Sequence, residues 1–457
     1  MNTRRSLTEG PIVKGLALFA LPIFLGQVFQ QLYNTADALI VGKFLSDEEY
    51  AAVTSSGTLI FLLIGLFAGI SVGAGVVIAR YFGAKDEENL RAAVHTTVGL
   101  GLIAGVLLTV IGVVFTPHLL RLMGTPETII EYSIEYFRMY FAGALAISMY
   151  NLLRGILQAV GDSKSPLYFL MLSSVVNIGL DLLFIGVLGW GVWSAALATT
   201  ISQFLSAALC FWRLMRTKGP HRIELRRIRL RADKVAEVIR FGLPSGVQNS
   251  IIAFANVVVQ SNINAFGDAA VGACGTYSKL ESFVFLPIMS ITMALTTFVS
   301  QNLGAKQYSR VKKGAAVGIV CCIIMAELVG ALLAFFPEPL IRLFTDNPAS
   351  IEIAIRQARL ESLFFFLMAF SHCIAAVMRG AGRPTVPMFV MLVCWCIIRV
   401  TYISLVVPLV GDIWVVFSAY PLTWGISAIV FAIFFFFTDW IHSYDRAEAK
   451  KSRAQTK

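Results

Sequence analysis

Two aspartates lie inside long apolar segments, where a charged side chain is costly. Asp37 lies in the segment 13–43 and Asp181 in the segment 164–188. A carboxylate near the middle of a bilayer costs at least about 2.5–3.5 kcal/mol on insertion scales. Such a residue has to be protonated, paired, or exposed to water or an ion. We therefore interpret both aspartates as cation-binding groups, with polar contact between helices as the alternative.

Neutral oxygen atoms accompany this acidic pair. Asn177 precedes Asp181 by four residues, so the two share one face of a helix, about one turn apart. Amide and hydroxyl oxygens on two further segments could face the same point. Carboxylate, amide and hydroxyl oxygens together suit either a proton-binding pair or a hard-cation site. The candidate cation-coupling residues are Asp37, Asn151, Asn177, Asp181 and Thr199, although Thr199 fits helix packing equally well.

Polar residues in the apolar segments of the second half are less specific. An arginine at depth needs a partner or water, a glutamate could attract a cationic substrate or pair with the nearby Lys279, and a lone histidine suits packing or titration. We expect some of these side chains to line a substrate cavity. The candidates are Gln248, Asn256, Glu281, His372 and Arg399.

The elements that position these residues follow from the composition. The chain has 457 residues, of which 57% are hydrophobic and 14% charged, and its mean hydropathy is +0.75. Soluble proteins carry about 25% charged residues, so lipid is the solvent that fits this chain. Long continuous apolar runs, such as 99–114 and 364–378, favour helices over the short alternating strands of a membrane barrel. The sequence thus predicts an all-α integral membrane protein.

Twelve apolar segments are long enough to cross a bilayer. The expected organisation is a six-helix lobe (1–217), a basic linker (218–233), a second six-helix lobe (234–441) and a basic tail (442–457). The expected spans are 13–43, 50–82, 91–113, 127–159, 164–188, 191–217, 234–266, 269–302, 312–335, 349–380, 386–409 and 412–441.

Charge and cysteine usage exclude several classes. The net charge of +10 comes from cations in short segments between apolar runs, which is typical of cytoplasmic loops and not of a nucleic-acid-binding surface. This pattern predicts that both termini are cytoplasmic. The seven cysteines lie within or beside apolar runs and indicate neither a disulfide framework nor a zinc site. Neither a phosphate-binding loop nor a catalytic constellation is evident, so we expect neither an enzyme nor a cofactor.

An internal repeat organises the chain. Gly83-Ala84-Lys85 recurs as Gly304-Ala305-Lys306, and Arg138 recurs as Arg359, with an offset of about 221 residues throughout. Each repeat holds an even number of spans, so both enter the membrane in the same orientation. This predicts a pseudo-two-fold axis along the membrane normal and a central cavity, as in transporters that work by alternating access.

The acidic pair is not repeated. Asp37 aligns with Val259 and Asp181 with Tyr402. We therefore expect the second half to lack an acid pair and the coupling chemistry to reside in the first half.

Several motifs resemble a known family, the multidrug and toxic compound extrusion (MATE) transporters. They are QLYNTAD at 31–37, GAK at 83–85, QAVGD at 158–162, NIGLD at 177–181, GAK at 304–306 and RGAGRP at 379–384. The resemblance covers roughly residues 10–440, and the acids of the first half are similar to those of the DinF-type or MepA-like branch.

The resemblance implies a MATE fold of two pseudo-symmetric six-helix bundles in the bacterial inner membrane. It also implies an antiporter that exports organic cations in exchange for H⁺, with Na⁺ at Asp37 and Asp181 as the alternative, and that works as a monomer. In the family, residues matching Asp37, Asn151, Asn177, Asp181 and Thr199 form the proton or sodium site of the first lobe. The runner-up function is a flippase for a lipid or a lipid-linked oligosaccharide, because such flippases share the superfamily.

Overall fold

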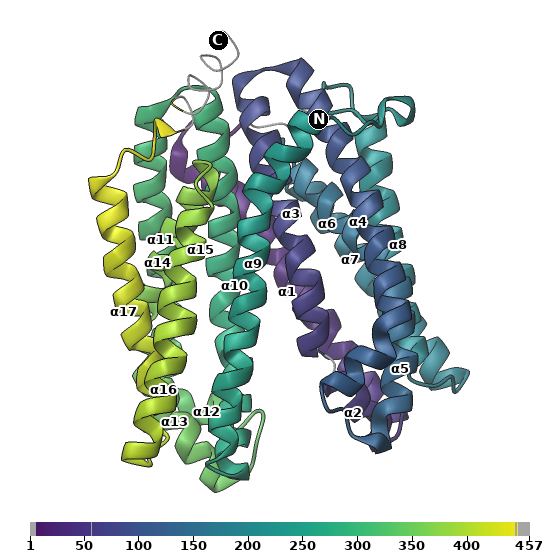
Figure 1. Ribbon diagram of the computed structural model, residues 1–457, viewed down its shortest axis with the longest axis vertical. Coiled ribbons are helices and arrows are strands. Elements are labelled where there is room, and N and C mark those ends of the chain that lie inside the picture. The colour runs from purple at the N-terminus through teal and green to yellow at the C-terminus, as the bar shows by residue number, and fades with distance from the viewer. Residues whose placement is uncertain (1–5, 56, 444–445, 447–457) are drawn as a thin grey trace. The chain divides into compact units, whose positions relative to one another are not determined.

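The computed structural model describes residues 6–55, 57–443 and 446 (Figure 1). Over this part of the chain the secondary structure is helical, with no strand. The first half comprises α1 (Ile12–Phe44), α2 (Asp47–Ser55), α3 (Gly57–Ala84), α4 (Glu87–Leu122), α5 (Glu127–Ala142), α6 (Ala144–Ala159), α7 (Lys164–Asp181), the π-helical η1 (Leu182–Val187) and α8 (Trp193–Arg216).

A linker containing one short helix leads to the second half. The short helix of the linker is η2 (Leu225–Arg227). The second half comprises α9 (Ala232–Asn264), α10 (Asp268–Gly304), α11 (Tyr308–Phe335), α12 (Pro337–Ile341), α13 (Pro348–Ser362), α14 (Phe365–Gly380), α15 (Thr385–Met391), the π-helical η3 (Leu392–Ile398), α16 (Arg399–Val410) and α17 (Trp414–Phe437).

The helices confirm the prediction of an all-α membrane protein. Among the described residues, eight helices are long and apolar enough to cross a membrane, or ten if each of two bent pairs counts as one span. The other two expected spans are also helical, as α3 and α9. The expected span 50–82 is described as parts of α2 and α3, and residue 56 between them lies outside the described residues.

The internal repeat is realised as a repeated backbone conformation. Lys85 and Lys306, the last residues of the two Gly-Ala-Lys motifs, have φ values of 57° and 55°, and no other described non-glycine residue has a positive φ. Asp86 N–H donates to Tyr81 O at 3.1 Å, and Gln307 N–H donates to Asn302 O at 2.8 Å. Each left-handed residue thus ends a helix in the manner of a Schellman cap. The repeat inferred from residue types is therefore a repeat of local structure.

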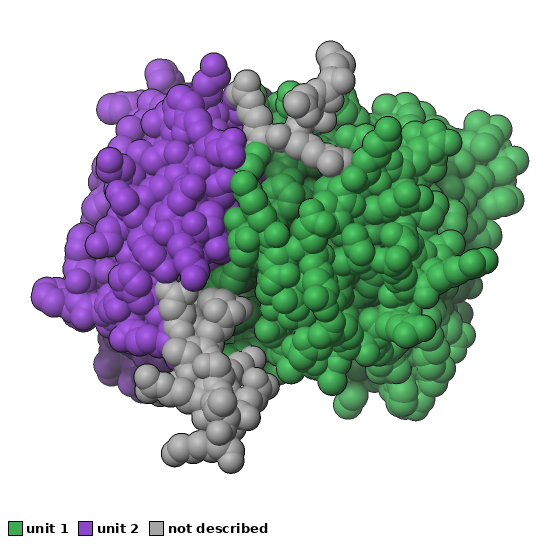
Figure 2. Space-filling model, turned by 90° about the horizontal axis from the view of Figure 1, so that it is seen from above, with its two compact units in different colours: residues 1–6, 21–246 green, residues 7–20, 247–457 purple. Residues whose placement is uncertain are grey.

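Two compact units divide the chain (Figure 2). The first unit contains Leu21–Gly246, and the second contains Leu7–Ala20 together with the residues from Val247 onward. The boundaries differ from those of the expected lobes because the first helix of each half is shared between the units. The changes of unit lie next to Pro22 in α1 and close to Pro244 in α9. Proline removes one backbone hydrogen bond and weakens a helix locally.

In the first unit, glycines allow the start of α9 to contact α3 backbone to backbone. A Cβ added at Gly73 would lie 2.4 Å from the backbone nitrogen of Gly242, and one at Gly69 would lie 2.2 Å from that of Gly246. Only residues without a side chain permit this approach. Gly75 is different, since no atom from another described helix lies within 4 Å of the position that its Cβ would take.

In the second unit, polar side chains hold the segment that precedes α1. Leu7 N–H donates to Gln301 Oε1 at 3.0 Å, and Asn302 Nδ2 donates to Leu7 O at 3.2 Å. The guanidinium of Arg310 donates to the carbonyl oxygens of Leu7, Glu9 and Gly10, the last at 2.8 Å. These bonds explain why the start of α1 belongs to the second unit.

One span in each half is broken near its middle. The pair α5 and α6 bends by 45° at Gly143, and the pair α13 and α14 bends by 55°. A Cβ at Gly143 would lie 2.1 Å from Thr200 Oγ1, so a side chain there would clash. At the second break, Phe366 N–H donates to Glu327 Oε1 at 2.7 Å, which satisfies a backbone donor that the broken helix leaves open.

Candidate coupling site

The structure brings the two predicted aspartates together. Asp37 on α1 and Asp181 at the end of α7 interact through their carboxyl groups. Asp181 is fully buried and Asn177, one turn earlier, is 1% exposed. The backbone changes from α to π geometry directly after Asp181, and π-helical turns are frequent at functional sites.

Apart from the interaction between the two carboxyl groups, the buried polar atoms of this site have no hydrogen-bond partners among the described residues. This holds for Oδ1 of Asp37, for both carboxylate oxygens of Asp181, and for both side-chain polar atoms of Asn177. A buried charge without a partner is expensive, and two neighbouring carboxylates cannot both remain ionised. The pair therefore requires at least one proton or one metal cation.

Two tyrosines lie within electrostatic reach of the acidic pair. Tyr33, four residues before Asp37, accepts a hydrogen bond from Gln30 Nε2 at 2.7 Å and one from Gln203 Nε2 at 3.5 Å. Tyr136 on α5 lies within electrostatic reach of both aspartates. It stacks on Tyr140 with a centroid distance of 6.2 Å.

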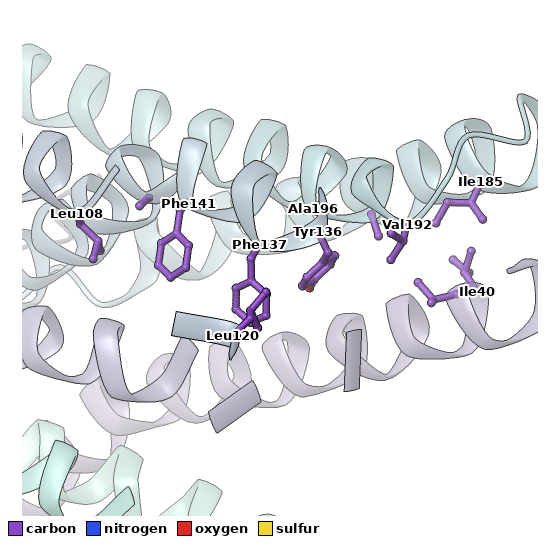
Figure 3. Close-up of a cluster of buried hydrophobic side chains, with 12 residues drawn as sticks. Ile40, Leu108, Leu120, Tyr136, Phe137, Phe141, Ile185, Val192 and Ala196 are labelled. Carbon is purple, nitrogen blue, oxygen red and sulfur yellow. The ribbon is translucent and has the colours of Figure 1, made fainter. Parts of the chain in front are cut away.

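Tyr136 also belongs to a buried apolar cluster (Figure 3). The cluster gathers side chains from α1, α4, α5, α6, η1 and α8. The residues labelled in Figure 3 are Ile40, Leu108, Leu120, Tyr136, Phe137, Phe141, Ile185, Val192 and Ala196. We did not predict the roles of Tyr33 and Tyr136. The spacing of Tyr33 from Asp37 was a usable signal, whereas no sequence pattern marks Tyr136.

Asn151 and Thr199 are not connected to the pair. The amide of Asn151 is used along its own helix, since Nδ2 donates to Ile147 O at 2.9 Å and Oδ1 accepts from Arg154 Nη2 at 3.3 Å. The half-buried hydroxyl of Thr199 makes no hydrogen bond to either aspartate among the described residues. The structure thus joins Asp37 and Asp181 directly and places Asn177 one turn before Asp181, whereas Asn151 and Thr199 make no hydrogen bond to either aspartate among the described residues.

In the second unit, Arg399 is the centre of a different polar cluster. It is 4% exposed and follows η3 directly. Its Nε and Nη2 donate to Thr423 Oγ1 at 3.2 and 2.9 Å, and its guanidinium lies 4.2 Å from the ring centroid of Tyr420. It interacts electrostatically with Glu281 and Glu361. We name Glu281, Glu361 and Arg399 the arginine cluster.

Glu361 is a residue that the sequence reasoning missed. It is fully buried on α13, and its Oε1 accepts a hydrogen bond from Gln357 Nε2 at 2.9 Å. It interacts with Glu281 as well as with Arg399. The expectation that the second half lacks an acid pair is therefore wrong. The repeat alignment places Tyr140 opposite Glu361, so the first half gave no indication of an acid at this position. A glutamate within the apolar segment 349–380 was nevertheless a usable signal.

Glu281 interacts with a different residue from Lys279, the partner that the sequence suggested. It lies well inside α10, 13 residues after Asp268, and interacts with Arg399. The ammonium of Lys279 instead lies 5.8 Å from the ring centroid of Phe344. The requirement that Arg399 have a partner or water is met by a partner, because Thr423 accepts two hydrogen bonds from the guanidinium, and the two glutamates act on it electrostatically.

The remaining candidates of the second half make no hydrogen bond to one another among the described residues. Gln248 is buried, and its Nε2 lies 2.7 Å from Met391 Sδ. Asn256 is exposed. His372 contacts the rings of Phe285 and Trp395 edge to face, at 5.7 and 5.2 Å, and its Nε2 has no hydrogen-bond partner in the described part of the chain.

A family model described as MatE matches residues 22–183 and 244–403, one stretch in each half. The chain belongs to the MatE family. It is thus a multi-pass membrane protein of a family of multidrug efflux transporters, and the resemblance inferred from the motifs is confirmed.

Relatives of this MATE transporter are similar to it over most of its length. The probable multidrug resistance protein YoeA of Bacillus subtilis is 32% identical over 383 residues, which cover 82% of this chain and 83% of YoeA. A protein named FAD transporter, from Shewanella oneidensis, is 26% identical over 77% of this chain and 78% of its own. The outward-facing structure of a multidrug resistance MATE family transporter superposes with a TM-score of 0.88 at 26% identity, covering 94% of this chain and 96% of that chain.

Proposed function

We propose that this MATE transporter is a proton-coupled antiporter that exports lipophilic organic cations. The observation that carries the proposal is the pair of Asp37 and Asp181, two interacting carboxyl groups whose three buried oxygen atoms have no other hydrogen-bond partner among the described residues. A proton is the smallest cation that satisfies such a pair, and it needs no further ligands. Hard metal cations prefer six or more oxygens, and no group of three or more metal-binding acidic, histidine or cysteine side chains occurs among the described residues.

In the proposed cycle, protonation acts as a switch between two conformational states. A proton taken up from outside neutralises the pair, which lowers the cost of closing the site against water. Loss of that proton to the cytoplasm restores a negative charge and favours binding of a cationic substrate. Because a ligand shifts an equilibrium only through unequal affinity for two states, the proton and the substrate must favour different states. The helix α1 carries Asp37 and is weakened at Pro22, so it is the element best placed to respond.

The substrate class follows from charge and from the relatives. A site with two acids and no arginine attracts cations, and the multidrug names of relatives such as YoeA fit this class. The FAD transporter of Shewanella oneidensis makes an anionic dinucleotide the second candidate. An anion would need a cationic pocket, and Glu281 and Glu361 already offset the charge of the buried Arg399 electrostatically. Neither relative's name supports the flippase alternative.

We further propose that both termini lie in the cytoplasm of a bacterial inner membrane and that one chain suffices for transport. The concentration of arginines in the linker between α8 and α9 supports this orientation. The duplicated architecture supports a monomer, because one chain already holds both halves.

The experiment is efflux of a fluorescent lipophilic cation from proteoliposomes with an imposed pH gradient or an imposed Na⁺ gradient, each applied alone. The proposal expects export with the pH gradient and none with the Na⁺ gradient, and it expects Asp37→Asn to abolish export. Export driven by Na⁺ alone would replace the proton with sodium. FAD export without cation export would select the second candidate.

A further inference from the structure

We propose that the linker between the two halves is a docking surface for anionic phospholipid headgroups of the membrane in which the protein sits. The surface consists of Arg222, Leu225, Arg226, Arg229 and Leu230, and we call it the linker surface. The inference concerns a region outside the coupling site and does not depend on the coupling ion.

The linker is held on α4 at a defined depth. The backbone N–H of Glu224 donates to His95 Nε2 at 3.0 Å, and Thr96 Oγ1 lies 3.3 Å from both Arg229 O and Arg231 N. Leu230 Cδ2 lies 3.1 Å from the position that a Cβ on Gly99 would take. The linker is therefore an ordered part of the first unit.

The contact points lie where α4 passes from water to lipid. With 36 residues, α4 is about 54 Å long, whereas the hydrocarbon core of a bilayer is about 30 Å thick. Residues 87–97 are mostly polar, and the continuous apolar run starts at Val98. Because the linker spans His95 to Gly99 of this helix, it lies at the level of the headgroups.

A tryptophan marks the same depth on the preceding helix. Trp212, on the last turn of α8, is 45% exposed, and the guanidinium of Arg216 lies 4.7 Å from its ring centroid. Tryptophan and arginine at a span end are typical of the membrane–water interface. The linker begins directly after this pair.

The linker surface has unneutralised charge and exposed apolar side chains together. The neighbouring acids are already paired, Glu224 with Arg227 at 2.9 Å and Asp233 with Arg231 at 3.1 Å. Arg222, Arg226 and Arg229 are exposed and pair with no described carboxylate. Leu225 and Leu230 are 63% and 47% exposed. Arginines match phosphate oxygens and leucines insert at the acyl boundary, a combination that fits an anionic lipid.

The test uses the full-length protein, which carries a photoreactive amino acid at one position, in nanodiscs that contain tagged lipids. A benzophenone amino acid replaces Leu225, and the bilayer contains equal amounts of tagged phosphatidylglycerol and tagged phosphatidylcholine. We expect crosslinks to phosphatidylglycerol to exceed those to phosphatidylcholine several-fold. The triple variant R222Q/R226Q/R229Q should bring the ratio close to one, because each arginine contributes up to about fivefold.

Two controls distinguish this site from a general attraction between basic residues and anionic lipids. The same label at Leu343, which is 74% exposed beside Arg342 paired with Glu338, should show no preference. Salt of about 1 M, where the Debye length is about 3 Å, should reduce the preference at position 225 even if the triple variant does not fold. Equal crosslinking of both lipids at position 225, crosslinking of neither, or the same preference at position 343 would overturn the proposal.

Discussion

The coupling site of the first unit and the arginine cluster of the second hold the same number of acids but different total charges. Asp37 and Asp181 interact with each other and with no basic side chain among the described residues, whereas Glu281 and Glu361 both interact electrostatically with Arg399. The first site therefore needs a mobile cation, and the second is partly neutralised by its own arginine. The two halves repeat their turn conformations at Lys85 and Lys306 but not their chemistry. Duplication has preserved the backbone while the ionisable groups have diverged.

The largest expected effect concerns the arginine that completes the second cluster. Arg399→Met leaves Glu281 and Glu361 buried without their cation, so we expect a loss of about 3–5 kcal/mol in the free energy of unfolding. Thermal unfolding of the purified variant in detergent measures this. Adding Glu281→Gln and Glu361→Gln should restore most of the stability. If Arg399→Met unfolds at the wild-type temperature, the cluster does not depend on its arginine.

The matching change in the first unit should act on transport instead of stability. We expect Asp37→Asn and Asp181→Asn each to reduce gradient-driven efflux about 100-fold, near the upper range of coupling between two sites, because neither amide can gain and lose the coupling proton. Their thermal stability should equal or exceed that of the wild type, since each removes an unpartnered buried acid. Efflux in proteoliposomes and unfolding in detergent measure the two effects. Wild-type transport by either variant would remove that aspartate from the coupling step.

A smaller effect on stability is expected at the helix break of the first unit. Gly143→Ala should destabilise the first unit by about 1–3 kcal/mol, because the new Cβ would overlap Thr200. Gly179→Ala is the matched control, since no atom from another described helix lies within 4 Å of the position that its Cβ would take. Thermal unfolding distinguishes them, and Thr200→Ala should rescue Gly143→Ala. Equal stability of the two alanine variants would show that the break at Gly143 tolerates a side chain.

The smallest expected effects on efflux test which neutral residues belong to the coupling site. Asn177→Ala should reduce efflux about tenfold, because its buried amide makes no hydrogen bond among the described residues and lies one turn from Asp181. Asn151→Ala and Thr199→Ala should change efflux less than about threefold. Initial efflux rates at matched expression provide the measurement. A loss on Asn151→Ala as large as that on Asn177→Ala would extend the site to α6.

Much of the fold and part of the site could be predicted from the residues. Asp37 and Asp181 were identified because a carboxylate in an apolar span is costly wherever the span lies. Asn177 followed from helical spacing. Asn151 and Thr199 were included without knowledge of helix rotation, which decides the direction of a side chain and is set by packing with neighbours.

Other features depend on tertiary contacts that no local pattern specifies. The assignment of Leu7–Ala20 to the second unit depends on hydrogen bonds to Gln301, Asn302 and Arg310, about 300 residues away in sequence. The role of Glu361 became visible only when α10, α13 and α16 were placed together around Arg399. Prolines at positions 22 and 244 marked weak points in α1 and α9 but not the change of unit.

The central claim is that the proton exchanged for substrate is bound at Asp37 and Asp181 and not at Glu361. The most direct test is proton release on binding of a lipophilic cation, recorded with a pH dye in weakly buffered detergent solution without Na⁺. The account predicts release by the wild type and by Glu361→Gln, and none by Asp37→Asn although that variant is folded. Release by Asp37→Asn together with its loss in Glu361→Gln would contradict the account and place the coupling proton in the arginine cluster.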